Sequence, residues 1–372
     1  MITGEVDMNQ GKLPHYLESR LDQVIENDLD SGRISLAGFQ FDILELKWVL
    51  DSETTIDIGF VQNYPEHHRE GVVETLAYFS EYRSAQYSYS MSLHLGNYIR
   101  HSNSLCLDGL FRFRAGCPKR SRDEYCSRLR CFFRQAVYLG FDVPEDFMKE
   151  FNSWVLKGSD KGIPVLTQDP ETGPFSELEF RAIKANLDYK YAEGAISDRE
   201  YSLAQLFAAT FRRPINLKQL KVKDLIASSK ALITKQPIYQ INIPRAKGKG
   251  RRFRSQFKAF ALIQSIGQVL SKHIETATKE LEQKIGRDLS LDEVKELPLF
   301  FDEQVAEDIR SLKDGQAMTY LKSELPHMKR SDLTFELKST IKKMGIISER
   351  TGQPLKVTGY RFQLLHRGLR AC

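Results

Sequence analysis

The chain has 372 residues, which is room for two domains. Hydrophobic residues make up 41% and charged residues 28%, values typical of a globular protein, and no apolar run approaches the ~20 residues that span a bilayer. The formal net charge is only +5, so binding to a polyanion would depend on local basic stretches and not on the total.

The five cysteines are few for a chain of this length, which is typical of a reducing compartment. The first residues lack the basic and then apolar pattern of a secretory signal, so we expect a cytoplasmic protein. Cys106, Cys117, Cys126 and Cys131 are close together, but their spacing does not match a paired zinc framework. We expect thiols that bind no metal, with a metal site as the alternative.

Residues 1–65 form an N-terminal region to which we assign no function. Aromatic and β-branched residues with partial alternation predict a short strand pair over 34–62, with Phe39, Phe41 and Ile43 on one face.

Helical spacing predominates over residues 66–160 and predicts a helical domain. One predicted helix lies within 121–139, with Val137 among its apolar residues and Gly140 at its end. Prolines and glycines then predict a linker over 161–174.

Residues 175–372 form the second predicted domain. Capping boxes at 176–179 and 197–200 each predict the start of a helix. A short helix over 215–226, a strand over 238–244, a basic turn and a long amphipathic helix over 255–285 follow. The expected fold class is therefore mainly α with small β elements, an α+β arrangement.

Two stretches are strongly basic. Between residues 111 and 134, eight arginines and lysines face only Asp123 and Glu124, whereas a solvated helix face usually mixes the two signs. This pattern predicts phosphate contacts without base readout, with an ordinary basic surface as the alternative. The candidate DNA-binding residues here are Arg112, Arg114, Arg120, Arg122, Arg128 and Arg130.

The second basic stretch is the turn after the 238–244 strand, where lysine and arginine alternate with glycine. Glycine lets such a turn approach a nucleic acid backbone closely, and a lysine there can reach a phosphate. A hairpin without chemistry is the alternative. The candidates here are Lys247, Lys249, Arg251 and Arg252.

The sequence "LAQLFAATFRRPINLKQLKVKDL" resembles the first signature box of the tyrosine recombinases, or phage integrases. In that box a Thr-Gly-hydrophobic-Arg turn precedes a helix with Leu-x-x-Leu and an aspartate. Here Phe211 replaces the glycine, and the resemblance implies that Arg213 is the first catalytic arginine. The hairpin that follows implies Lys247, with Lys249 as the alternative, as the general acid on the leaving oxygen.

The sequence "VTGYRFQLL" resembles the second box, His-x-x-Arg or Arg-Arg-Phe-Arg. Tyr360 stands at the histidine position and Gln363 at the second arginine position, with Arg361 as a further DNA-binding candidate. A shifted register over 367–370 restores Arg-x-x-Arg but breaks the link to the preceding residues. The family's nucleophilic tyrosine comes a few tens of residues later. We therefore expect a truncated or frameshifted integrase without its nucleophile and final helices.

The resemblance covers 175–362, and residues 66–160 resemble the family's core-binding domain only loosely. It implies a site-specific recombinase of a mobile element, in which two arginines stabilise the phosphate charge while a tyrosine attacks. The implied partners are double-stranded DNA and further recombinase copies, without a membrane, cofactor or metal, at a bacterial nucleoid. We expect DNA binding without strand cleavage. The alternatives are a non-catalytic DNA-binding regulator on the same fold and an unrelated RNA- or protein-binding module.

Overall fold

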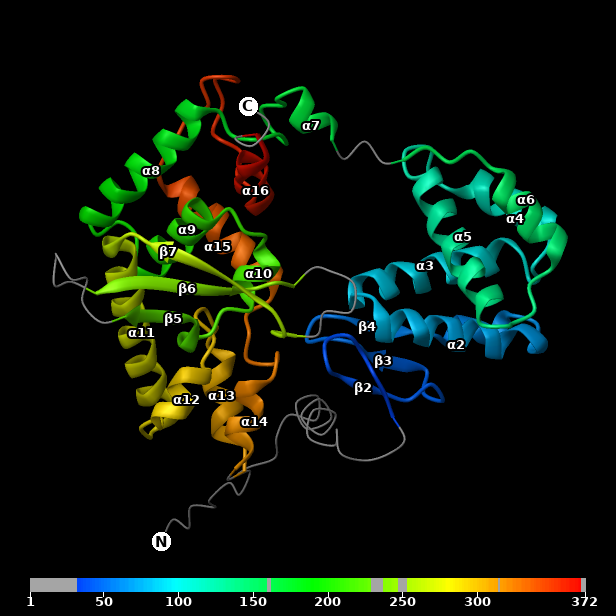
Figure 1. Cartoon of the computed structure of the whole chain (residues 1–372), viewed down its shortest axis with the longest axis horizontal. Helices are drawn as coiled ribbons and strands as arrows, with labels where there is room; N and C mark the ends of the chain where they lie inside the picture. The colour runs from blue at the N-terminus through cyan, green and yellow to red at the C-terminus, as the bar shows by residue number, and fades with distance from the viewer. Residues whose placement is uncertain (1–31, 159–161, 229–236, 247–252, 314, 369–372) are drawn as a thin grey trace, which may run out of the picture. The chain divides into compact units, whose positions relative to one another are not determined.

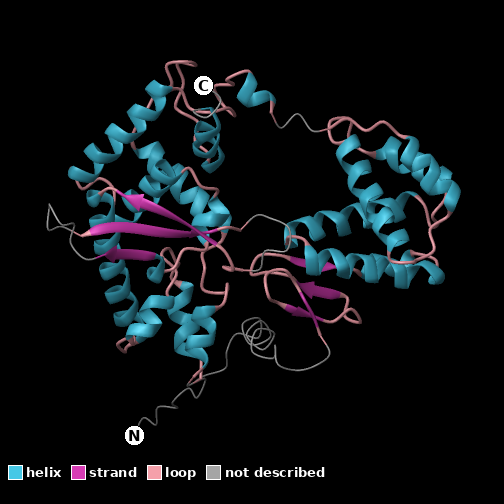
Figure 2. Ribbon diagram, viewed as in Figure 1, coloured by secondary structure: helices cyan, strands magenta, loops and turns pink. Residues whose placement is uncertain are grey.

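The computed structural model describes residues 32–158, 162–228, 237–246, 253–313 and 315–368 (Figure 1). The chain forms two compact units, the first within residues 20–160 and the second mainly from residue 161 onward. Helices predominate and the sheets are small and antiparallel, which confirms the predicted fold class (Figure 2). Among the described residues, no helix is both long and apolar enough to cross a membrane.

The first unit begins with two small sheets and continues with helices. One predicted strand pair is instead two separate antiparallel pairs, β1 with β2 and β3 with β4. The elements are β1 (Arg33–Ile34), β2 (Gln40–Phe41), β3 (Lys47–Val49), β4 (Thr55–Asp57), the 3-10 helix η1 (Gly59–Asn63), α2 (Glu66–Tyr82), α3 (Ala85–His101), α4 (Leu107–Gly116), α5 (Arg122–Tyr138) and α6 (Glu145–Ser153).

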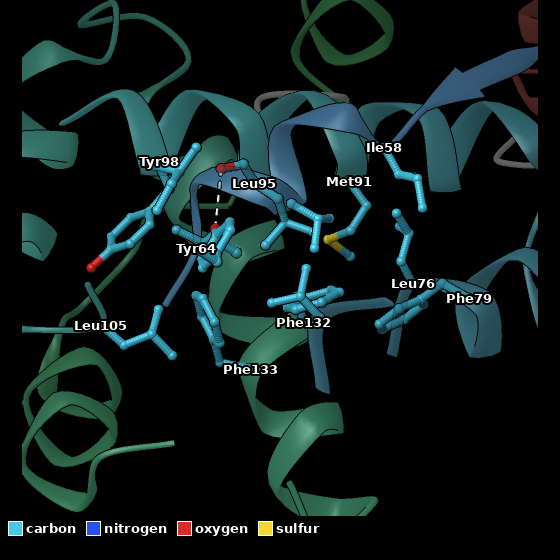
Figure 3. Packing of buried hydrophobic residues seen from close by; sticks show 14 of the residues in the cluster. Ile58, Tyr64, Leu76, Phe79, Met91, Leu95, Tyr98, Leu105, Phe132 and Phe133 are labelled. Carbon is cyan, nitrogen blue, oxygen red and sulfur yellow. Dashed lines mark hydrogen bonds between the residues drawn. The ribbon is translucent and has the colours of Figure 1, made fainter. Parts of the chain in front are cut away.

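The strands and helices of the first unit share one hydrophobic core. Trp48 and Ile56 on the strands and Leu76 and Phe132 on the helices are fully buried in it. Figure 3 shows its centre, where the Tyr64 hydroxyl donates a hydrogen bond to the Leu95 carbonyl at 3.2 Å. The strands before the predicted boundary at residue 65 therefore share a core with the helices after it, and small two-stranded hairpins are only marginally stable without such packing.

The predicted helix over 121–139 forms as α5, with one face in the core. Leu129, Phe132 and Phe133 are buried, and the chain turns at Gly140 with a positive φ of 86°. Of the apolar residues noted in this helix, Val137 alone is largely exposed, at 49%. It lies in the last turn of α5, on the side that faces solvent.

We expect the first unit to lose stability below neutral pH because of His94. Burial lowers the pKa of His94 to about 4, and the Arg128 guanidinium acts in the same direction. An unfolded histidine has a pKa near 6.5, so the unfolded state binds the proton first and stability falls as the pH drops from about 6.5 to about 4.

Replacing His94 with glutamine should remove up to about 3 kcal/mol of that pH dependence. Both tryptophans, Trp48 and Trp154, lie in the first unit, so urea unfolding followed by tryptophan fluorescence reports this unit. An unchanged pH dependence in His94→Gln would show that this histidine is not responsible.

The second unit surrounds a three-stranded antiparallel sheet in the order β5-β6-β7. Both predicted capping boxes form, with Ser176 and Ser197 as the capping residues. The elements are α7 (Ile163–Leu166), α8 (Glu177–Ala192), α9 (Asp198–Thr210), α10 (Pro214–Lys218), η2 (Val222–Asp224), β5 (Leu225–Ser228), β6 (Ile238–Pro244), β7 (Phe257–Leu262), α11 (Gln264–Ile285), α12 (Leu291–Glu296), α13 (Gln304–Ser311), α14 (Gln316–Lys322), α15 (Arg330–Lys343) and α16 (Gly359–Gly368).

Strand β7 corrects the prediction of a single long helix over 255–285. Residues 257–262 pair with β6 in antiparallel register, from Tyr239 opposite Leu262 to Pro244 opposite Phe257. The backbone hydrogen bonds of this ladder and the burial of Leu262 outweigh the helical spacing of the apolar residues. The helix α11 begins only at Gln264.

Helix α9 is the central helix of the second unit. Leu203, Leu206 and Phe207 are fully inaccessible, and the helix packs against α8, α11 and α15. A helix that is buried on nearly every side is held rigidly by its neighbours. The turn at its C-terminal end, which carries the first signature-like segment, is therefore placed by the core itself.

Candidate functional site

The turn after α9 adopts a left-handed conformation at Phe211, the position where the family box that it resembles has a glycine. Phe211 adopts a left-handed conformation with φ 53° and ψ 34° and caps α9 through its backbone N–H to the Phe207 carbonyl. Glycine adopts this conformation most easily. The ring of Phe211 lies 5.9 Å from the ring of Phe180, a contact that glycine would lack. Arg213 then becomes the N-cap residue of α10.

Two close contacts join this turn to segments that are distant in sequence. The Asn216 side-chain amide donates a 2.6 Å hydrogen bond to the carbonyl of Pro244, at the end of β6. A Cβ on Gly359 would lie 2.7 Å from Pro214 Cγ and 2.9 Å from a ring carbon of Phe207. The start of α16 therefore packs directly on the α9–α10 turn, and only a glycine fits there.

Four basic residues lie on the segments that meet at this place, and we call them the junction cluster: Arg212, Arg213, Arg245 and Lys258. The Arg212 guanidinium lies 4.6 Å from the centre of the Phe260 ring, and Lys258 Nζ lies 5.4 Å from the same ring. The Arg245 backbone N–H donates to the Gln256 carbonyl and so extends the β6–β7 ladder by one residue. Alternation along the ladder places Arg245, Lys258 and Phe260 on one face.

The junction cluster carries positive charge that the protein does not neutralise fully. Within the described residues, the side chains of Arg213, Arg245 and Lys258 form no ion pair with a carboxylate, whereas nearby Arg254 is paired with Asp224 at 2.8 Å. Arg212 and Lys258, which both lie over the Phe260 ring, repel each other, and an anion relieves that repulsion. Guanidinium groups suit phosphate oxygens because they are planar and always charged.

Sequence reasoning did not identify Arg245 or Lys258. Arg245 lay inside the basic turn but not at a signature position, and residue 258 was assigned to a helix. The predicted turn residues Lys247, Lys249, Arg251 and Arg252 lie outside the described residues, so the hairpin lysine stays a prediction.

Arg361, a candidate DNA-binding residue, does not present its side chain to solvent in the structure. Its side chain is fully buried, with Nη2 3.1 Å from Glu179 Oε2 and Nε 2.9 Å from the Gly173 carbonyl. It also donates to the Lys356 carbonyl and lies over the Phe175 ring. Arg361 instead attaches α16 to the start of α8.

The same contacts shorten the predicted linker over 161–174. The carbonyls of Gly173 and Pro174 accept hydrogen bonds from Arg361, and Pro174 also accepts one from Arg350. The end of the predicted linker is therefore part of the second unit, because it supplies acceptors to two arginines.

Tyr360 and Gln363 lie near the start of α16. Tyr360 is 50% exposed and Gln363 is half-buried. Gln363, which the resemblance aligns with the second arginine of the family, is neutral. Arg370, which completes the alternative register, lies outside the described residues.

Carboxylates pair with more of the basic residues in the first unit's stretch than its sequence indicated. Arg112 pairs with Asp108 at 2.7 Å and Arg128 with Glu124 at 2.9 Å, both across one helical turn. Asp108 lies just before the stretch, so the sequence interpretation omitted it. These two pairs have exposed members and are weak, so an anion can compete for the arginines.

Other arginines of this stretch have structural contacts. Arg130 donates to the carbonyls of Phe151 and Trp154 and so closes the end of α6. The Arg114 guanidinium lies 4.4 Å from the centre of the Trp154 ring. Arg120 is exposed and Arg122 is half-buried. The six candidates therefore do not form one surface of equivalent, unpaired cations.

Comparison with known proteins adds no family assignment. No protein-family model matches the chain, and no curated protein matches it.

Proposed function

We propose that the chain binds the phosphate backbone of double-stranded DNA at the junction cluster, on a second unit that resembles a tyrosine recombinase catalytic domain. The observation that carries this proposal is the packing of Gly359 on Pro214 and Phe207. It brings together the two segments that resemble the family's signature boxes, which lie far apart in sequence. Coincident motifs in an unrelated protein have no reason to meet in this way.

In this proposal Arg213 supplies a guanidinium to the non-bridging oxygens of one phosphate, and Arg245 and Lys258 hold neighbouring phosphates. Such contacts position a duplex and carry no sequence information of their own. The basic residues of the first unit, Arg120 above all, provide further phosphate contacts. We place the chain among integrase-like proteins of mobile elements, with further copies of the same protein as partners on DNA.

The neutral Gln363 favours a DNA-binding regulator over an active recombinase as the second candidate function. Two guanidinium groups stabilise the charge that builds on the phosphate during phosphoryl transfer. The loss of one such donor lowers the rate by about 10²–10³. In this proposal the described part of the site holds a phosphate, but neutral Gln363 leaves the position that resembles the second catalytic arginine without a positive group for cleavage.

A photo-crosslinking experiment tests the location of DNA on the second unit. Tyr360, exposed at the start of α16, is replaced by benzoylphenylalanine, and random duplex DNA is added at low salt before irradiation. We expect a covalent protein–DNA adduct because residue 360 lies next to the α9–α10 turn.

Tyr189, which is 57% exposed on α8, gives a matched control. It lies ten residues along the helix from Glu179, or about 15 Å from the end that contacts Arg361. The proposal predicts little adduct there. An adduct of equal yield at both positions, or none at residue 360, contradicts it.

A further inference from the structure

Asn216 links the backbones that carry two arginines of the junction cluster. Its backbone N–H donates a 2.9 Å hydrogen bond to the Arg213 carbonyl, in the first turn of α10. Its side-chain amide donates a 2.6 Å hydrogen bond to the carbonyl of Pro244, the residue before Arg245. Asn216 is 8% exposed, so water competes little for these bonds. A single buried residue therefore contacts the main chain at Arg213 and directly before Arg245.

The peptide group between Pro244 and Arg245 is held at both ends. Its carbonyl accepts the hydrogen bond from Asn216, and its N–H donates a 2.8 Å hydrogen bond to the Gln256 carbonyl of the neighbouring strand segment. A peptide group is planar, so hydrogen bonds at its two ends fix its orientation. The proline ring also restricts the backbone just before it. These constraints fix the direction in which the exposed Arg245 side chain leaves the backbone.

Helix α10 gives Asn216 a fixed support, although a helix of five residues is not stable by itself. Buried contacts hold its C-terminal end. His327 Nδ1 donates a 2.8 Å hydrogen bond to the Lys218 carbonyl, and the Lys218 ammonium pairs with Glu324 at 3.0 Å. Because α10 is anchored in this way, the amide of Asn216 can hold the end of β6 in place.

We propose that Asn216 is a positioning residue, which holds Arg245 relative to Arg213 so that the two guanidinium groups contact neighbouring phosphates of one duplex. This inference rests on the proposed DNA binding at the junction cluster. Hydrogen bonds from a guanidinium to a phosphate are directional, so an arginine whose backbone is displaced loses much of its contact. Without the asparagine amide, the buried Pro244 carbonyl loses this donor, and the end of β6 shifts.

A double-mutant cycle tests this role through the affinity for random duplex DNA, measured by fluorescence anisotropy. Asn216→Leu removes the side-chain donor but keeps the backbone hydrogen bond to Arg213. We expect Asn216→Leu and Arg245→Gln each to weaken binding by about 5–10-fold, and the double variant to bind about as weakly as either single variant. In combination with Arg213→Gln, the loss from Asn216→Leu should multiply, because the asparagine side chain does not act through Arg213.

Asn186→Leu is the matched control for the loss of an asparagine amide. Asn186 donates a 2.9 Å hydrogen bond to the Ala182 carbonyl, but within α8. Its replacement should leave the affinity for DNA unchanged. Circular dichroism checks that each variant is folded. If Asn216→Leu does not fold, Asn216→Ser takes its place in the cycle, because the serine side chain is too short to reach the Pro244 carbonyl.

The cycle separates a failure of this inference from a failure of the DNA site. If Arg245→Gln weakens binding but Asn216→Leu does not, or if the two losses multiply, Asn216 does not position Arg245, although the DNA site remains. If Arg245→Gln leaves the affinity unchanged, the proposed phosphate contact at Arg245 is wrong, and the role of Asn216 is wrong with it.

Discussion

Replacing Glu179 with alanine is expected to lower the free energy of unfolding of the second unit by about 3–5 kcal/mol, because it leaves a buried charge without its partner. Glu179 is 1% exposed and accepts hydrogen bonds from Arg361, Arg350 and Ser348. Burial raises the pKa of Glu179, but the hydrogen bonds from Arg350 and Ser348 outweigh it and hold the pKa below its usual value. Arg361 would remain buried with only carbonyl oxygens around it.

Urea unfolding measured by far-ultraviolet circular dichroism follows this change, with tryptophan fluorescence as an internal reference for the first unit. Glu177→Ala is the matched control, because Glu177 is in the same helical turn but its side chain is 77% exposed and forms an exposed pair with Arg181. That control should cost no more than about 0.5 kcal/mol. Equal costs for the two variants would show that the buried pair is not important for stability.

Neutralising the junction cluster is expected to weaken DNA binding by about 10²–10³. The variant carries Arg213→Gln, Arg245→Gln and Lys258→Gln, which remove the charge and keep a polar side chain. A loss of 10²–10³ corresponds to about 3–4 kcal/mol in total, or about 1–1.4 kcal/mol for each of the three contacts, which is within the range of a net hydrogen bond. Affinity for random duplex DNA, measured by fluorescence anisotropy, gives the result. Stability should change little, because none of the three side chains is buried.

A second triple variant distinguishes DNA binding at the junction cluster from general electrostatic attraction between DNA and a basic protein. Lys184→Gln, Lys279→Gln and Lys322→Gln change the net charge by the same amount on exposed positions of α8, α11 and α14. We expect them to weaken binding far less. If the two triple variants lose affinity equally, the junction cluster is not the DNA site.

Local signals in the sequence predicted several elements correctly. Ser176 and Ser197, each followed by a glutamate three residues later, mark helix starts because a capping box needs only neighbours along the chain. Strand β6 was also recognised, since its alternating residues show which side is buried. The helix end at Phe211 was predicted because the neighbouring residues resemble the family's first box. The residue type at position 211 did not indicate it.

Contacts between residues that are distant along the chain could not be predicted from the sequence. Arg361 looked like a surface cation because its partner, Glu179, lies 182 residues earlier in the chain. Lys258 was not identified as a site residue, because residues 257–262 have helical spacing and become a strand only through pairing with β6. In the first unit, Arg130 has carbonyl partners from α6 that no charge pattern reveals.

The salt dependence of DNA binding is the most direct test of a phosphate site at the junction cluster. Each phosphate contact that a protein makes on duplex DNA contributes about 0.9 to the slope of log affinity against log salt concentration. A phosphate site at the junction cluster predicts a steep negative slope for the wild-type chain and a slope smaller by about 2–3 for the Arg213, Arg245 and Lys258 triple variant. Identical slopes for the two proteins would contradict it.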